Sequence, residues 1–313
     1  MRAATNNLNK KPNLLSKENN MPQSTQTNIV EKPNLLDIVA WICAAVSLFP
    51  FAVWLFGEVS RSRQLSDALT ISVCICVAVA MDAAVRLHKP KLGRRALAFL
   101  GLAYAAVLAS PYCGIASMPL GMAGLSLFLM AAGFACTDKP RFVFAAGVAF
   151  YAFLMLSLFI SAFDMPLRAL AGNISVGILK LANPSAMLVS LPEYPPQIGM
   201  IVNSKNYLVA AECNGFGLIS SCATLSVFFA ALSKAPIRDR LILALLGVLT
   251  AVAANALRIV AIVTIAPHFG KEYYMAVHEA CGYFFFALAL LAVWKTGRAK
   301  IALGRRSQSP DGS

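Results

Sequence analysis

Three side chains suited to nucleophilic chemistry follow one another along the last third of the chain. Cys213 stands at the start of one apolar run, Arg258 interrupts the next, and His278 opens the last. A thiol near a cation and an imidazole is the makeup of a cysteine nucleophile. An arginine inside an apolar run is expensive, so it indicates a functional residue. Cys213, Arg258 and His278 are therefore the candidate catalytic residues.

Each of the three has a chemical role to which its type is suited. The start of a helix favours a thiolate at Cys213, because the helix dipole and free N–H groups stabilise negative charge. Arg258 is suited to stabilise an oxyanion or to hold the thiolate charged; the alternative is a structural ion pair with Glu212 or Glu279. His278 is suited to act as general base and then as acid to a leaving amine.

Neighbouring residues supply candidate supporting groups. Asn255 lies three residues before Arg258 and shares its helix face, where it is suited to orient the guanidinium or a substrate amide, or simply to hold helices together. Asn214 and Gly215 follow the cysteine, and Gly215 leaves room for a backbone to approach closely. Glu212 precedes the cysteine and completes the supporting set.

The competing histidine and the metal alternative are both weaker. His268 follows Pro267 in the connection between the last two apolar runs, and we expect it to be a surface loop residue. One cysteine and one histidine, without CxxC or HxxxH spacing, do not make a zinc set. We therefore predict no metal site and no cofactor.

Composition places the chain in a membrane. Of its 313 residues, 58% are hydrophobic and 13% charged, and its mean hydropathy is +0.68. Repeated apolar runs long enough to cross a bilayer predict an all-α polytopic membrane protein. The net charge of +13 does not indicate nucleic-acid binding, because the basic residues lie between membrane segments. Most of the cysteines lie in apolar runs, where cysteine behaves as a small hydrophobe. The sequence does not decide whether Cys113 forms a disulfide.

We predict about eight transmembrane helices and five regions. The helices are expected over residues 36–56, 68–86, 95–110, 118–136, 142–163, 213–233, 241–266 and 275–294. The regions are a disordered cytoplasmic tail (1–34), a five-helix membrane bundle (35–163), an extracytoplasmic loop (164–212), a catalytic three-helix region (213–297) and a basic cytoplasmic tail (298–313). Within the loop we expect an interfacial helix over 167–181 and a small β-hairpin over 197–211, turning at 203–206.

The distribution of basic residues predicts the orientation. With the first tail in the cytoplasm, 20 lysines and arginines fall on the cytoplasmic side and 6 on the other, with Arg258 between them. This excess predicts both termini in the cytoplasm and the three candidate residues in the outer half of the cytoplasmic membrane. Arg258 lies about eight residues, or about 12 Å, below the expected helix end. Either the site is sunk below the surface, or this helix ends before Pro267.

The stretch from about 166 to 297 resembles the exosortase/archaeosortase family of membrane-embedded cysteine transpeptidases. The matching elements are Ala211-Glu212-Cys213-Asn214-Gly215, Asn255-Ala256-Leu257-Arg258-Ile259 and His278-Glu279-Ala280-Cys281-Gly282, in this order on consecutive helices. The family usually has Ser or Ala between the cysteine and the glycine, where this chain has Asn214. The five preceding helices match only in general character.

The resemblance implies a protein-sorting activity. The family's cysteine, arginine and histidine fall on Cys213, Arg258 and His278. It implies exported protein substrates with a C-terminal sorting signal, which consists of a short motif, a membrane helix and a basic cluster. The enzyme would cut at the motif through a thioester and pass the acyl group to an acceptor such as a glycan or a lipid. The alternative is a transporter or membrane scaffold in which Arg258 binds an anionic ligand; the last three helices lack the mid-depth Gly/Pro breaks typical of transport sites.

Overall fold

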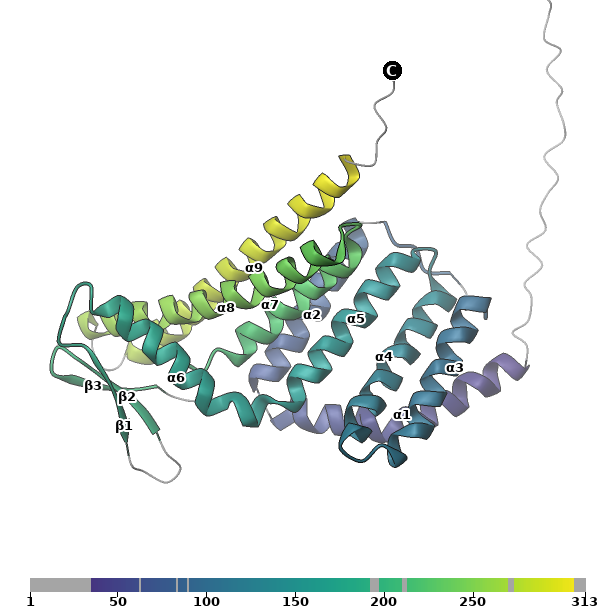
Figure 1. Ribbon diagram of the computed structural model, residues 1–313, viewed down its shortest axis with the longest axis horizontal. Helices are drawn as coiled ribbons and strands as arrows, with labels where there is room; N and C mark the ends of the chain where they lie inside the picture. Colours follow the sequence, from purple (N-terminus) through teal and green to yellow (C-terminus); the bar gives the residue numbers. More distant parts are fainter. Residues whose placement is uncertain are drawn as a thin grey trace, which may run out of the picture.

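The described part of the protein is a helical bundle with one small antiparallel sheet at one end (Figure 1). The computed structural model describes residues 35–61, 63–82, 84–88, 90–191, 197–209, 213–269 and 273–306. The tail expected over 1–34 lies outside the described residues, as do residues 307–313.

Each predicted helix has a counterpart among the described residues, and one further long helix follows the fifth. The helices are α1 (Leu35–Arg61), α2 (Arg63–Asp82), α3 (Arg94–Ala109), α4 (Ser117–Cys136), α5 (Pro140–Leu158), α6 (Ile160–Leu179), α7 (Phe216–Leu232), α8 (Ile237–Ile265) and α9 (Tyr274–Arg306). Short 3-10 turns are η1 (Ser110–Tyr112), η2 (Gly114–Ala116) and η4 (Ala266–His268).

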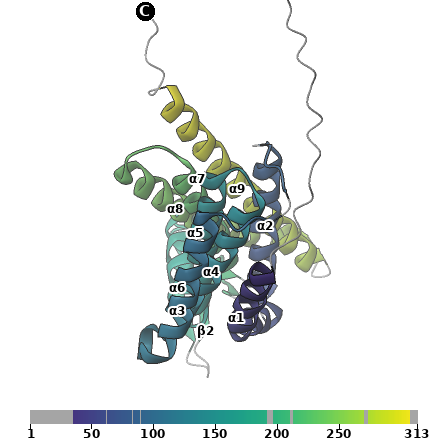
Figure 2. The ribbon, with the colours of Figure 1, turned by 90° about the vertical axis from the view of Figure 1, so that its right-hand side faces the viewer.

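Five helical stretches of the described chain are long and apolar enough to cross a bilayer. They are Arg94–Tyr112, Gly114–Cys136, Pro140–Leu158, Ile237–His268 and Tyr274–Ile301. α7 has 17 residues and so spans about 26 Å, short of a hydrocarbon core of about 30 Å. Multiple spans make this a multi-pass membrane protein, whereas the count of eight transmembrane helices is not confirmed. α1 contacts α3 and α4 but crosses them instead of running parallel to them (Figures 1 and 2).

The segment expected to be an interfacial helix is a longer helix that starts earlier. α6 begins at Ile160, directly after the end of α5, so the region boundary drawn between 163 and 164 falls inside it. α6 packs against α8, where the buried Ser175 hydroxyl donates to the Ala256 carbonyl at 3.1 Å. This contact ties α6 to the helix that carries Arg258.

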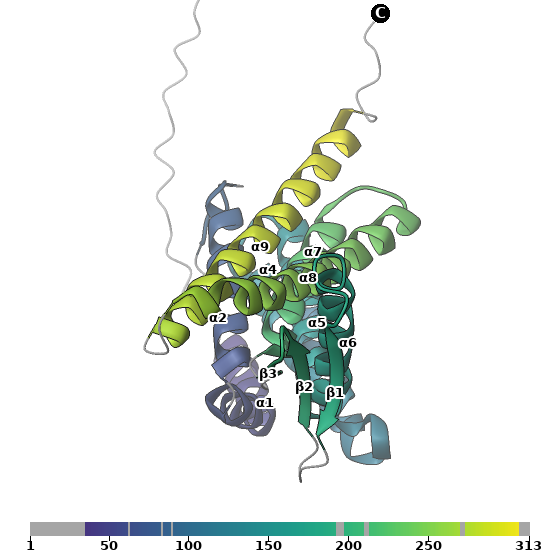
Figure 3. The same ribbon diagram turned by 90° about the vertical axis from the view of Figure 1, so that its left-hand side faces the viewer.

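The small sheet has three antiparallel strands in the order β1 (Met187–Leu191), β2 (Gln197–Val202) and β3 (Lys205–Leu208). The predicted hairpin is confirmed as β2–β3. Its turn residues Asn203 and Ser204 have φ of 51° and 60°, as the tight turns between twisted antiparallel strands require. β1 was not predicted. The sheet packs against α6 (Figure 3).

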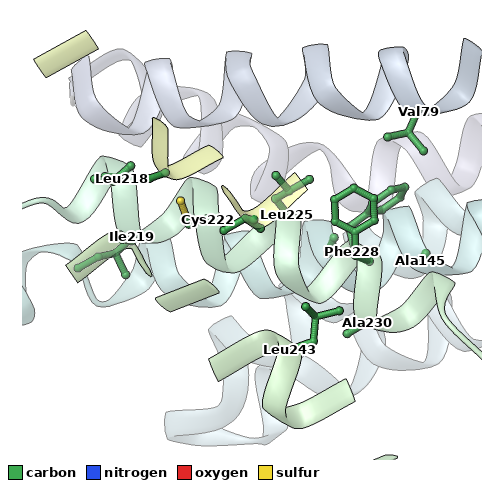
Figure 4. Packing of buried hydrophobic residues seen from close by; sticks show 14 of the residues in the cluster. Val79, Ala145, Leu218, Ile219, Cys222, Leu225, Phe228, Ala230 and Leu243 are labelled. Atoms are coloured by element: carbon green, nitrogen blue, oxygen red, sulfur yellow. The ribbon is translucent and has the colours of Figure 1, made fainter. Parts of the chain in front are cut away.

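α7 is the buried centre of the bundle. It contacts α2, α5, α8 and α9, and most of its residues are buried, as expected of a helix surrounded by protein. Phe228, Leu225 and Cys222 on α7 pack in one cluster with Ala145 of α5 and Leu243 of α8 (Figure 4). Because α7 packs against helices on several sides, the position of its first turn is fixed. The residues that immediately precede it, including Cys213, are therefore anchored at that end.

Basic side chains gather at one end of the bundle. Arg95, Arg141, Lys234 and Arg240 line a cavity where α3, α5 and α8 begin and α4 and α7 end. We call this the basic end. The start of α7, the start of α9 and the sheet lie at the opposite end, which we call the site end (Figure 1).

Candidate active site

The structure brings Cys213, Arg258 and His278 together at the site end. Cys213 Sγ lies 3.6 Å from His278 Nε2, within hydrogen-bonding reach for sulfur. The same nitrogen lies 3.5 Å from Arg258 Nη2. The imidazole thus stands between a thiol and a permanent cation. Cys213 is 8% exposed, while Arg258 and His278 are half-buried.

Three elements supply these residues at similar depth. Cys213 precedes α7, whose N-cap is Gly215. Arg258 lies seven residues before the end of α8 at Ile265, which is about 10 Å along the axis. His278 lies four residues after the start of α9. α8 ends at Ile265, before Pro267 and one residue short of the expected end, and Arg258 lies below that end.

The cysteine loop, residues 213–215, is held by α8. Asn255 Nδ2 donates to the Cys213 carbonyl at 2.9 Å, and Asn255 is only 2% exposed. Gly215 has φ +74°, and a Cβ there would lie 2.5 Å from Asn255 Cγ. The loop therefore needs glycine for its conformation and for the space that Asn255 fills. Asn255 thus contacts the backbone of the candidate nucleophile.

Asn214 faces the opposite way, toward α6. Its Nδ2 donates to Asp164 Oδ1 at 2.6 Å, and its Oδ1 accepts the Phe216 N–H at 2.8 Å. Asp164 in turn forms an ion pair with Arg168. Sequence reasoning missed Asp164 and Arg168. The available signal was an acid and a base four residues apart in an otherwise apolar helix.

Two further residues pack against the candidate catalytic groups. Gly282 of α9 lies beneath the Arg258 guanidinium, and a Cβ there would come within 3.3 Å of Nη2. The Tyr274 ring stacks on His278 with centroids 6.4 Å apart. Both residues lie one turn from His278, on the same helix. α9 thus fixes the imidazole and leaves room for the guanidinium beside it.

The sheet and α6 cover the thiol. Cys213 belongs to an apolar cluster that also contains Ile198 and Met200 of β2, Ala171 of α6 and Ile259 of α8. Parts of the predicted extracytoplasmic loop therefore pack over the cysteine.

The remaining sequence candidates fall elsewhere. Glu212 lies outside the described residues. His268 is exposed in η4, and it is His278 that contacts Cys213.

Asn255 Oδ1 is buried and has no hydrogen-bond partner among the described residues, so it is a potential acceptor beside the cysteine loop.

A multi-pass membrane bundle with a cysteine, a histidine and an arginine grouped near one end defines a membrane protein with a candidate cysteine-nucleophile centre. The model of the transmembrane exosortase family matches residues 81–295, and the chain belongs to this family. The family resemblance read from three motifs is thereby confirmed. The match begins well before residue 166, at the end of α2, so it also covers helices that the motifs did not reach. No curated protein and no solved structure matches the chain.

Proposed function

We propose that this protein is a membrane cysteine peptidase or transpeptidase that cleaves C-terminal sorting signals of exported proteins through a thioester acyl-enzyme. The observation that carries the proposal is the single imidazole nitrogen shared by Cys213 Sγ at 3.6 Å and Arg258 Nη2 at 3.5 Å. Membership of the exosortase family supports protein sorting in a membrane as the setting. The substrates would carry a recognition motif, a membrane helix and a basic cluster.

The charges favour a particular order of events. Two unit charges about 4 Å apart interact by about 4 kcal/mol at an effective dielectric constant of about 20. The permanent cation of Arg258 therefore favours negative charge nearby. In this proposal that charge is the tetrahedral oxyanion, which Arg258 stabilises as it forms.

The chemical steps follow from these positions. Cys213 Sγ attacks the scissile carbonyl carbon, and its proton passes to His278 Nε2. The C–N bond breaks, the leaving amine takes that proton, and a thioester remains on Cys213. An acceptor hydroxyl, amine or water then attacks the thioester while His278 removes its proton. The acyl carbon bonds to the acceptor, its C–S bond to Cys213 breaks, and His278 returns the proton to the departing thiolate.

We further propose that both termini are cytoplasmic and that the site faces the outer half of the cytoplasmic membrane. The basic end lies opposite the site end, which supports this orientation by the positive-inside rule. The same rule would hold a substrate's basic cluster in the cytoplasm and leave its motif at the outer face. Enzyme and substrate would then meet by diffusion within one bilayer.

The test is to trap the acyl-enzyme. The intact protein is incubated in membranes with a candidate substrate, and its cysteine peptides are analysed by mass spectrometry. We expect the substrate's acyl fragment on Cys213 and loss of processing in Cys213→Ala. Cys222→Ala is the matched control, because Cys222 is fully buried in α7 away from the site. Processing by Cys213→Ala, or an adduct on Cys281 instead, would refute the proposal.

A further inference from the structure

The cysteine loop is tied to a helix that carries none of the three candidate catalytic residues. Asn214 Nδ2 donates to Asp164 Oδ1 at 2.6 Å, across 50 positions of sequence. The other end of the same amide accepts the Phe216 N–H at 2.8 Å, which satisfies a free donor in the first turn of α7. Asn214 is only 4% exposed. One buried side chain thus links the start of α7 to α6.

Asp164 is itself held in place by Arg168, one turn further along α6. The guanidinium pairs with the carboxylate through Nη2, and its Nε donates to Oδ1 at 3.2 Å. The two side chains are 16% (Arg168) and 28% (Asp164) exposed, so solvent screens them less than a surface pair. A two-point guanidinium–carboxylate contact orients the carboxylate as well as stabilising it. Asp164 Oδ1 is therefore kept facing Asn214.

We infer that Asp164 and Arg168 are positioning residues that act through Asn214 to set the distance between the Cys213 thiol and the His278 imidazole. The catalytic meaning of the Cys213–His278 distance rests on the proposed function. The contacts that set this distance do not depend on that function. Asn255 holds the Cys213 carbonyl from α8, and Asp164 holds the next residue, Asn214, from α6. With the backbone fixed from two helices, the thiol has little freedom beyond its own rotamer.

A helix cap alone does not account for this arrangement. A serine hydroxyl at position 214 would also accept the Phe216 N–H, because Ser is among the best N-terminal capping residues. Serine has one polar side-chain atom, whereas Asn214 reaches Phe216 with Oδ1 and Asp164 with a separate atom, Nδ2. The amide of Asn214 therefore contributes a link to α6 that a cap does not require. Asn214→Ser separates the two contributions.

The test measures how fast iodoacetamide alkylates Cys213 in the intact, detergent-solubilised protein over a series of pH values, using mass spectrometry of the Cys213 peptide. We expect Asp164→Ala and Asn214→Ser each to alter this profile and to lower turnover of a substrate about tenfold to a hundredfold with KM little changed. The double variant should be no worse than either single one, because both cut the same link. Ser175→Ala is the matched control, since it removes a different contact of α6 with α8.

Two results from these variants would overturn the inference, and a substitute pair of variants covers a failure to fold. A wild-type profile in Asp164→Ala overturns it, as do additive effects in the double variant. If Asp164→Ala does not fold, Asp164→Asn combined with Asn214→Asp keeps an amide and a carboxylate with the partners exchanged. A restored profile then supports the link, and a profile like that of Asn214→Ser overturns it. Alkylation needs no substrate, so it tests the positioning roles separately from the proposed function. If the wild-type protein processes no substrate while the variants still change the alkylation profile, the proposed function is refuted and the positioning roles stand.

Discussion

Replacing Gly215 by alanine tests the cysteine loop at its tightest point. Gly215 has φ +74° and ψ 9°, and an added Cβ would lie 2.5 Å from both Cγ and Nδ2 of Asn255. A Cβ atom does not come this close to a non-bonded heavy atom, so one of the two residues must move. Asn255 is 2% exposed and packed within α8, so we expect the loop rather than the helix to shift.

The magnitude follows from two separate costs. A left-handed conformation costs a non-glycine residue about 1–2 kcal/mol. Displacing the loop also breaks the 2.9 Å hydrogen bond from Asn255 to the Cys213 carbonyl, and leaving such buried groups unpaired costs about 1–3 kcal/mol. Together we expect Gly215→Ala to lower the free energy of unfolding by about 2–5 kcal/mol, a large part of the 5–15 kcal/mol typical of a folded protein.

The assay is unfolding of the intact protein in detergent, followed by tryptophan fluorescence and combined with the rate of Cys213 alkylation. Gly177→Ala is the matched control, because Gly177 lies within α6 and a Cβ there would meet nothing within 4 Å. Alanine should stabilise that position by roughly 0.5–1 kcal/mol. Equal stability of Gly215→Ala and the wild-type protein, with unchanged alkylation of Cys213, would refute the reasoning about the loop.

Three further predictions concern the cation, its neighbour and the orientation. Arg258→Lys keeps the charge but loses the forked donors, so we expect it to insert normally and to lose about a hundredfold in turnover, while crosslinking still detects bound substrate; wild-type turnover would reduce Arg258 to a charge anchor. Gly282→Ala should leave the melting temperature equal or higher, because alanine favours the helix by about 1 kcal/mol, yet lower turnover by crowding the guanidinium 3.3 Å away; unchanged turnover would show that the guanidinium has room to spare. In a cysteine-free background, Ser204→Cys should react with an impermeant reagent added outside intact cells and Lys234→Cys only after permeabilisation; the reverse pattern would place the site in the cytoplasm.

Local patterns in the sequence determined the class of the protein and the order of its candidate site residues. Hydropathy depends on composition over a window, so the apolar runs predicted the helices that became α1–α5 and α7–α9, although not which of them span a membrane. The turn at Asn203 and Ser204 was predictable because a tight hairpin depends on a few adjacent residues. Cys213, Arg258 and His278 stood out because each residue type is unusual in its own apolar surroundings, without reference to the others.

Only the tertiary structure decided how these residues meet. The 2.6 Å contact between Asp164 and Asn214 joins positions 50 residues apart, and no local period in the sequence encodes it. The role of Asn255 as a support for the Cys213 carbonyl likewise depends on how close α8 comes to the cysteine loop, which Gly215 makes possible. Pairing across helices is set by packing of the whole bundle, since each helix can present its faces in many rotations until its neighbours exclude all but one. The sequence therefore determines which groups are available, and the packed fold determines which of them share a site.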